Sequence, residues 1–114
     1  MKENNKTNKI YEIKLVNGVE MNKKYPKTFF IPSEYFLTKN LKIGSIVKIS
    51  DFHYSERFWV CVLEFIDENT MICEIRNDLY GNQPYDFLDK IIVKRNNIIG
   101  YEHFTKKEEI DEEK

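Results

Sequence analysis

The stretch RFWVCVLEFI, from Arg57 to Ile66, decides the fold of this chain. It is apolar at nearly every position, which is typical of a strand that is covered on both faces. A polar turn from Asp67 to Thr70 follows, and the segment Met71 to Arg76 then alternates apolar and polar residues. Together these segments predict a β-hairpin from Glu56 to Arg76 at the centre of the domain.

The length of the turn sets the register of this hairpin. A tight loop would place Ile66 opposite Met71 and Val62 opposite Ile75. That register gathers apolar side chains on one face, with Glu64 as the only polar one. The members of this face are Phe58, Val60, Val62, Ile66, Met71, Cys73 and Ile75. Cys61 then points away from Cys73, so no disulfide is expected, although a one-residue slip would reverse this.

Shorter elements surround the hairpin. Alternation predicts a strand from Ile10 to Val16, and Asn17-Gly18 reads as a turn that tolerates positive φ. Ser33 can cap a short helix that runs through Asn40. Further strands are expected at Ile46 to Ser50 and Lys90 to Lys94.

These elements predict a mostly β (α+β) fold, with about five strands and one short helix. The expected architecture is a small, strongly curved antiparallel sheet or partly open barrel. The last segment, Asn97 to Tyr101, fits an edge strand or a single helical turn. It and the strand Ile10 to Val16 offer edges through which two copies could pair as a homodimer.

One domain accounts for the 114 residues. Residues 10–104 form the β-rich domain, between a flexible polar arm at residues 1–9 and a flexible charged tail at residues 105–114. The chain shows neither a signal peptide nor a membrane-spanning run, so the expected location is cytoplasmic, or the host cell interior if the protein is viral.

The charges divide unevenly along the chain. Residues 1–48 carry a net charge of +6 and residues 49–114 a net charge of −7. Such a division predicts a dipolar surface if the two halves stay apart in the fold. If the halves interleave, their charges cancel.

Catalytic motifs are missing from the sequence. His53 and His103 stand alone, and the spacing of Cys61 and Cys73 fits no common zinc site, so neither metal nor cofactor is expected. Paired carboxylates remain an alternative, although solvated loop acids are the favoured interpretation. The carboxylates in question are Glu56, Glu64, Asp78, Asp86 and Asp89.

A set of aromatic and polar residues gathers near the open end of the hairpin. In the register above, Arg57 meets Tyr80 and Trp59 lies near Asp78. Tyr, Trp and Arg dominate binding hot spots because they combine a large contact area with a polar group. The predicted binding residues are Tyr54, Arg57, Trp59, Asn77, Tyr80 and Tyr85. The competing interpretation makes Trp59 a core residue and the others ordinary loop residues.

These residues favour a non-catalytic module that binds a protein partner, and not an enzyme. One form of this hypothesis is an immunity or counter-defence protein, whose acidic second half would complement a basic active site. The alternative is a single-stranded nucleic-acid-binding protein that uses exposed aromatics and lysines. Against that alternative, most lysines lie early in the sequence, away from the aromatic set.

A family resemblance covers about Phe30 to Tyr101. The residues that carry it are Ile31-Pro32-Ser33, LKIGSIVKI at Leu41 to Ile49, ERFWVCVLE at Glu56 to Glu64, and Asn77-Asp78. Their order resembles an uncharacterised YegJ-like domain family of bacteria and large DNA viruses. The family tends to place Gly-Asp where this chain has Leu88-Asp89. The resemblance implies a domain and its boundary, and it transfers no mechanism.

Overall fold

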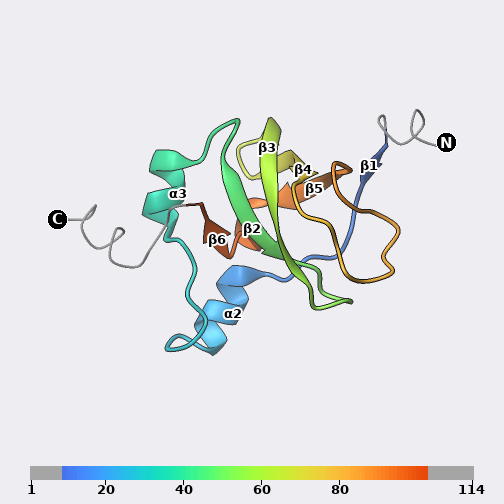
Figure 1. Ribbon diagram of the computed structural model, residues 1–114. Helices are drawn as coiled ribbons and strands as arrows, with labels where there is room; N and C mark the ends of the chain where they lie inside the picture. Colours follow the sequence, from blue (N-terminus) through green and yellow to red (C-terminus); the bar gives the residue numbers. More distant parts are fainter. Residues whose placement is uncertain (1–8, 103–114) are drawn as a thin grey trace.

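Six strands form one mixed sheet, with two helices beside it (Figure 1). The computed structural model describes residues 9–102. The strand order across the sheet is β1-β5-β4-β3-β2-β6, and only the β1–β5 pair is parallel. The strands are β1 (Ile10–Tyr11), β2 (Ile46–Ser50), β3 (Arg57–Asp67), β4 (Thr70–Ile75), β5 (Lys90–Lys94) and β6 (Gly100–Tyr101). The helices are α2 (Gly18–Lys24), α3 (Glu34–Asn40) and the 3-10 turn η1 (Arg95–Asn97).

The central hairpin is confirmed, but its predicted register is wrong beyond the turn. Asp67 pairs with Thr70, as the tight loop requires, whereas Val62 pairs with Cys73. Two register shifts in β3 cause the difference, and they leave Leu63 and Ile66 without a direct partner. Each shift inserts one extra residue, as a β-bulge does, so the two together move the register by two residues.

The bulges also explain the one polar residue in the predicted apolar face. Beyond Val62 the extra residue changes which side chains face the core, so Phe65 packs against the core. Glu64 is exposed, and Ile66 is 53% exposed. The prediction that Ile66 belongs to the core is therefore wrong. The sequence pattern kept a strict two-residue period where the strand does not.

The predicted helix after Ser33 is confirmed as α3. The Ser33 hydroxyl accepts the backbone N–H of Phe36 at 3.0 Å, which satisfies a donor that the first turn would otherwise leave free. Phe36 and Leu37 bury against the sheet, and Phe36 meets the ring of Tyr101 edge-on at 5.1 Å.

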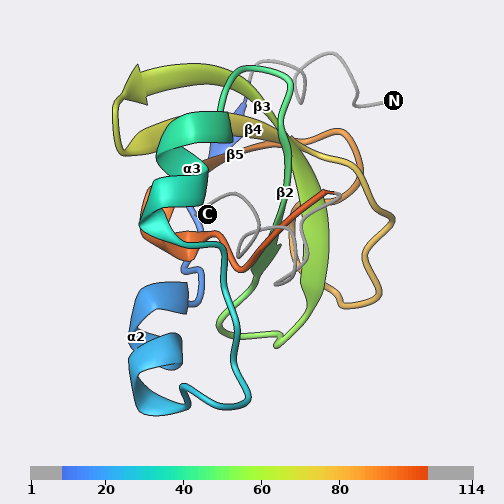
Figure 2. The same ribbon diagram turned by 90° about the vertical axis from the view of Figure 1, so that its left-hand side faces the viewer.

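Helix α2 replaces the turn that Asn17-Gly18 predicted. Asn17 caps this helix, because its side chain accepts the backbone N–H of Glu20 at 3.1 Å. Asparagine suits both a turn and a helix start, so the sequence pair did not distinguish them. Figure 2 shows α2 and α3 on the same side of the molecule, with the chain after β5 between them.

The segment from Ile10 to Val16 connects distant parts of the sheet. Its first residues pair with β5, and Leu15 then forms a bridge to Asp51 at the end of β2. The predicted continuous strand is therefore only two residues long. β1 and β6 are the two edge strands, and they do not pair with each other, so the sheet is not closed into a barrel.

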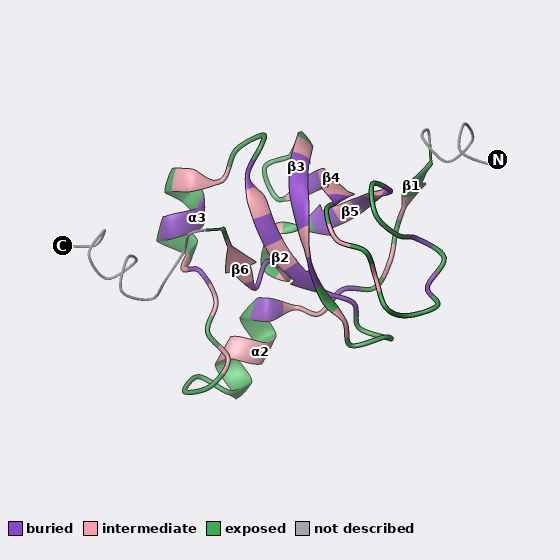
Figure 3. Ribbon diagram, viewed as in Figure 1, coloured by how far each residue is buried: buried purple, intermediate pink, exposed green. Residues whose placement is uncertain are grey.

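The core cluster joins side chains of the sheet to Phe36 and Leu37 of α3 and to Ile98. Figure 3 shows the buried positions along the central strands and on α3. Cys73 is buried in this core. Cys61, which pairs with Glu74 across the sheet, is buried as well, and both thiols are free. Burial, reinforced by the neighbouring Cys61, raises the pKa of the Cys73 thiol from 9.0 to about 12. Cys73 is therefore an inert core thiol at neutral pH.

The predicted terminal segments fall largely beyond the structure. Apart from Lys9, the arm at residues 1–9 lies outside the described residues, and so does the tail at residues 105–114. Within residues 9–102, no helix has the length and apolar character needed to cross a membrane.

Candidate functional site

The loop between β4 and β5, residues 76–89, is fastened to the start of β3 by one carboxylate. Glu56 accepts the backbone N–H groups of Tyr80 at 2.8 Å and Gly81 at 3.2 Å. It also accepts the side-chain amide of Gln83 at 3.0 Å. Hydrogen bonds to a charged acceptor are stronger than neutral ones, so Glu56 holds the outer part of this loop in place.

The loop between β2 and β3, residues 51–56, lies against the first loop. Its own turn is closed by Asp51, which accepts the backbone N–H of Tyr54 at 2.8 Å. A methyl group at Gly81 would come within 3.2 Å of the Tyr54 ring, so the two loops touch at this point. The same methyl group would collide with the side-chain amide of Gln83, so glycine at position 81 leaves room chiefly for Gln83.

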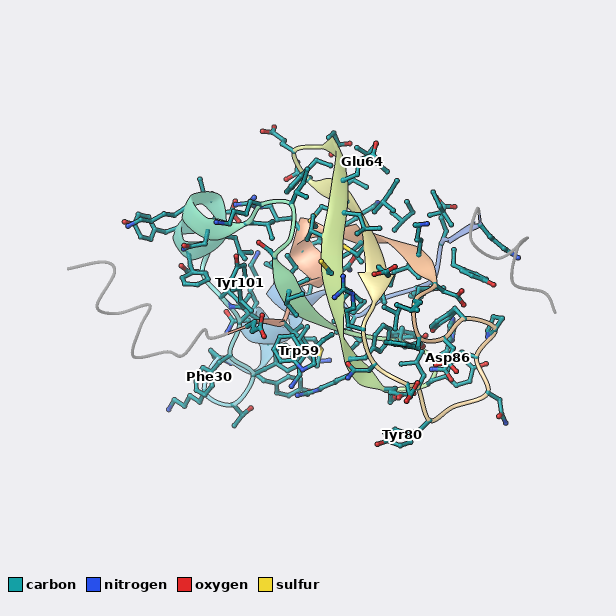
Figure 4. All side chains as sticks on the ribbon, turned by 45° about the horizontal axis from the view of Figure 1, so that its top comes forward. Phe30, Trp59, Glu64, Tyr80, Asp86 and Tyr101 are labelled. Atoms are coloured by element: carbon teal, nitrogen blue, oxygen red, sulfur yellow. The ribbon has the colours of Figure 1, made fainter. Side chains whose placement is uncertain are left out.

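Large apolar side chains project from both loops, and we call this surface the loop end. Tyr80 is 95% exposed, and Figure 4 shows it at the outer side of its loop, pointing away from the sheet. Four other large side chains of the loop end are about half exposed, namely Phe52, Tyr54, Phe87 and Leu88. Soluble proteins rarely concentrate exposed apolar side chains in this way unless the surface is used for binding.

Two residues of the loop end have a strained backbone. Ser55 has φ of +56° and Leu88 has φ of +73°. Leucine pays a steric penalty in this left-handed region, whereas glycine does not. The YegJ-like resemblance places glycine where Leu88 stands. Leu88 thus combines backbone strain with a side chain that is 52% exposed, so burial does not offset the strain.

Beside the loop end, the outer face of β2 and β3 carries cations against aromatic rings, and we call it the strand face. Lys48 lies directly across from Trp59, and its ammonium is 5.2 Å from the centre of the indole ring. The guanidinium of Arg57 is 5.6 Å from the ring centre of Phe29. The expectation that lysines stay away from the aromatic set is wrong at Lys48, because β2 and β3 are neighbours in the sheet.

The predicted binding residues occupy three different environments. Tyr54 and Tyr80 are at the loop end, and Arg57 and half-buried Trp59 are on the strand face. Asn77 joins the two surfaces, because its side-chain oxygen accepts the backbone N–H of Trp59 at 2.6 Å.

Tyr85 differs from the other predicted binding residues. It is 3% exposed and packs with Tyr11 and Phe58 at ring-centre distances of 5.9 and 6.5 Å. Tyr85 is therefore a core residue, and its side chain is not part of the loop end.

Two predicted contacts do not follow the predicted register of the hairpin. They are Arg57 with Tyr80 and Trp59 with Asp78. The two bulges shift β4 by two residues, so the backbone carbonyl of Trp59 accepts the N–H of Arg76 at 2.9 Å. Glu56, which sequence reasoning considered only as a possible catalytic acid, takes the contact with Tyr80 instead.

Two of the other acids considered for catalysis, Asp86 and Asp89, stabilise the backbone of the loop. Asp86 accepts the N–H groups of Leu79 at 2.9 Å and Phe87 at 2.8 Å, and Asp89 accepts that of Asp86 at 2.9 Å. Glu64 lies on β3, at the bulge. Within the part of the chain that the structure describes, no group of three or more His, Cys, Asp or Glu side chains could hold a metal ion.

Sequence reasoning missed Phe87 and Leu88 as exposed residues. Both lie in the stretch from Asn77 to Asp89, which is rich in turn-forming residues, and the turn pattern alone does not tell exposed from buried apolar residues. The mismatch with the Gly-Asp pattern was the one signal in the sequence that marked this position.

Comparisons with protein-family models, with curated proteins and with solved structures gave no significant match. The YegJ-like resemblance therefore stays a prediction. The class that the fold and the surface define is a small α+β domain, with an open, mixed six-stranded sheet and an exposed aromatic end.

Proposed function

We propose that this protein is a non-catalytic binding module that recognises a protein partner through the loop end. The observation that carries the proposal is the full exposure of Tyr80 on a loop whose backbone Glu56 fixes. A rigid loop lowers the entropy lost on binding, and an exposed tyrosine supplies contact area with only two rotatable side-chain bonds.

The other exposed side chains of the loop end have the composition of a protein-binding surface. Tyr54, Phe87 and Leu88 give apolar contact area, and the exposed acid Asp78 lies in the same loop. Aromatic anchors with a polar rim are the common composition of such interfaces. A partner with an apolar pocket and basic groups around it fits this composition, and the immunity or counter-defence form of the proposal belongs to this kind of complex.

Site-specific photo-cross-linking tests the proposal. A photoreactive phenylalanine analogue replaces Tyr80 in one variant and Tyr35 in the other, in cells that normally contain the protein. Tyr35 is a matched control, because it is 48% exposed on α3 and lies on the other side of the molecule (Figure 1). We expect one discrete protein adduct from position 80 that weakens when Tyr54→Ala is added. Equal adducts from both positions, or none from position 80, would contradict the proposal.

The immunity form makes an additional prediction about kinetics. If the partner is basic, its association rate should fall steeply between low and physiological salt, while its dissociation rate changes little. An association rate that does not depend on salt would exclude this form and leave the binding proposal intact.

Single-stranded nucleic acid is the second candidate, and the Lys48–Trp59 contact favours it. A lysine beside a partly exposed indole on a sheet face resembles the surfaces on which bases stack. Trp59 is the only tryptophan, so its fluorescence reports directly on such stacking. We expect an oligothymidine to quench this fluorescence at low salt, with weaker binding in Lys48→Gln. No quenching at low salt would exclude this candidate.

A further inference from the structure

A cavity of about 650 Å³ lies outside both surfaces described above. It is formed by α2, the segment that joins α2 to α3, the start of α3, and the chain from β5 into η1. Figure 2 shows these segments gathered on one side of the sheet. Its volume is in the range of pockets that hold small organic molecules, about 300 to 1,000 Å³.

One wall of the cavity is apolar. Its side chains come from both helices, from the segment between them and from the residue after η1, and they include Val19, Pro26, Phe30, Leu37 and Ile98. Hydrogen bonds hold the wall in shape. The side-chain amide of Asn22 donates to the carbonyl of Phe29 at 2.8 Å, which ties α2 to the joining segment. This wall suits an aromatic or aliphatic group of a ligand.

The other wall carries more positive than negative charge. Arg95 donates through Nε to the Glu34 carboxylate at 3.1 Å and through Nη2 to the Thr38 hydroxyl at 2.6 Å. These bonds neutralise Glu34 and fix the guanidinium, whose side chain is only 16% exposed. Among the described residues, Nη1 of Arg95 and the ammonium of Lys94 have no partner. The cavity thus presents one excess positive charge beside an apolar wall.

We propose that this cavity binds a small amphipathic anion. Its apolar body would lie against Phe30 and Val19, and its carboxylate or sulfonate would face Lys94 and Arg95. Arginine and lysine are the usual partners of such groups, and Arg95 is already oriented by Glu34 and Thr38. This site is independent of the loop end, so its test and the cross-linking test fail or succeed separately.

The test uses the anionic dye 8-anilinonaphthalene-1-sulfonate and its uncharged analogue N-phenyl-1-naphthylamine. We expect one saturable dye site, with the largest backbone chemical-shift changes in the residues that line the cavity. Charge reversal in Lys94→Glu should weaken dye binding about tenfold, a change of about 1.4 kcal/mol. Lys42→Glu is the matched control, because it reverses an exposed lysine that does not line the cavity and should leave binding unchanged.

A second variant tests the apolar wall. Val19→Trp should block binding by filling the cavity, and an unchanged thermal midpoint would show that it folds, since Val19 is 39% exposed. Equal binding of the charged and uncharged dyes, equal binding by Lys94→Glu and the native protein, or shifts confined to the loop end would each overturn the proposal.

Discussion

The carboxylate of Glu56 accepts the backbone N–H of Tyr80 at 2.8 Å, across 24 residues of sequence. Glu56 directly precedes β3, whose first half carries the buried residues Phe58, Val60 and Val62, and Tyr80 is the most exposed large apolar residue in the part of the chain that the structure describes. The bond therefore joins the rigid core of the protein to the residue that we propose as the anchor for a partner.

Removing this bond should release the loop without unfolding the protein. In Glu56→Ala, the amides of Tyr80 and Gly81 should exchange with solvent at least about tenfold faster, because a hydrogen bond to a charged group contributes about 1.5 to 3 kcal/mol. Hydrogen exchange measured by NMR checks this. Glu64→Ala, at an exposed acid elsewhere on β3, should change neither amide. Unchanged exchange in Glu56→Ala would show that other contacts hold the loop.

Leu88 should lower the stability of the fold and strengthen binding of the partner. The left-handed backbone costs a leucine about 1 to 2 kcal/mol, and glycine avoids this cost but loses about 0.5 to 1 kcal/mol in entropy. Leu88→Gly should therefore raise the free energy of unfolding by about 0.5 to 1 kcal/mol in urea denaturation. It should also weaken binding of the protein captured from position 80. A loss of more than about 1 kcal/mol in stability would mean that the leucine side chain holds the fold.

The bulges in β3 predict that truncating two isoleucines lowers the free energy of unfolding by very different amounts. Ile75 is fully buried and Ile66 is 53% exposed, although the sequence pattern assigns both to the core face. Ile75→Ala should cost about 2 to 5 kcal/mol, whereas Ile66→Ala should cost less than about 0.5 kcal/mol. Urea denaturation of both variants checks the register, and similar losses in the two would contradict it.

How far the sequence predicts the fold depends on the element. The hairpin, α3 and the strand β5 follow from apolar periodicity and from the Ser33 cap, which are local signals. The bulges at Leu63 and Ile66 do not, because an extra residue in a strand leaves no mark in composition. Helix α2 was missed because Asn17 suits a turn as well as a cap.

The candidate site was predictable only in part, for related reasons. Tyr54, Tyr80, Arg57 and Trp59 are accessible to a ligand, and their residue types pointed to binding. Tyr85 is also a tyrosine in the loop, so its residue type pointed to binding as well, yet tertiary packing against Tyr11 and Phe58 buries it. The Lys48–Trp59 contact depends on the pairing of β2 with β3, which a linear view of the charges does not show.

Because the pKa of Cys73 is raised in the fold, the free energy of unfolding should fall at alkaline pH. The buried thiol stays protonated up to a pKa of about 12, whereas the unfolded chain releases this proton above about 9. The protonated thiol contributes fully to the free energy of unfolding below pH 9. This contribution is lost progressively as the pH rises toward 12, by at most about 1.4 kcal/mol per pH unit. Urea denaturation between pH 8 and 10.5 measures the slope. Cys73→Val should show a smaller slope than the native protein, and identical slopes would refute this cause.

The central claim is that the loop end contacts a protein partner, and amide hydrogen exchange tests it most directly. The protein is compared alone and in complex with the partner captured from position 80. We predict slower exchange on binding at residues 52–56 and 78–88, with little change in α3 and β6. Protection confined to α3, β6 or the cavity wall, with unchanged exchange at residues 78–88, would contradict the account.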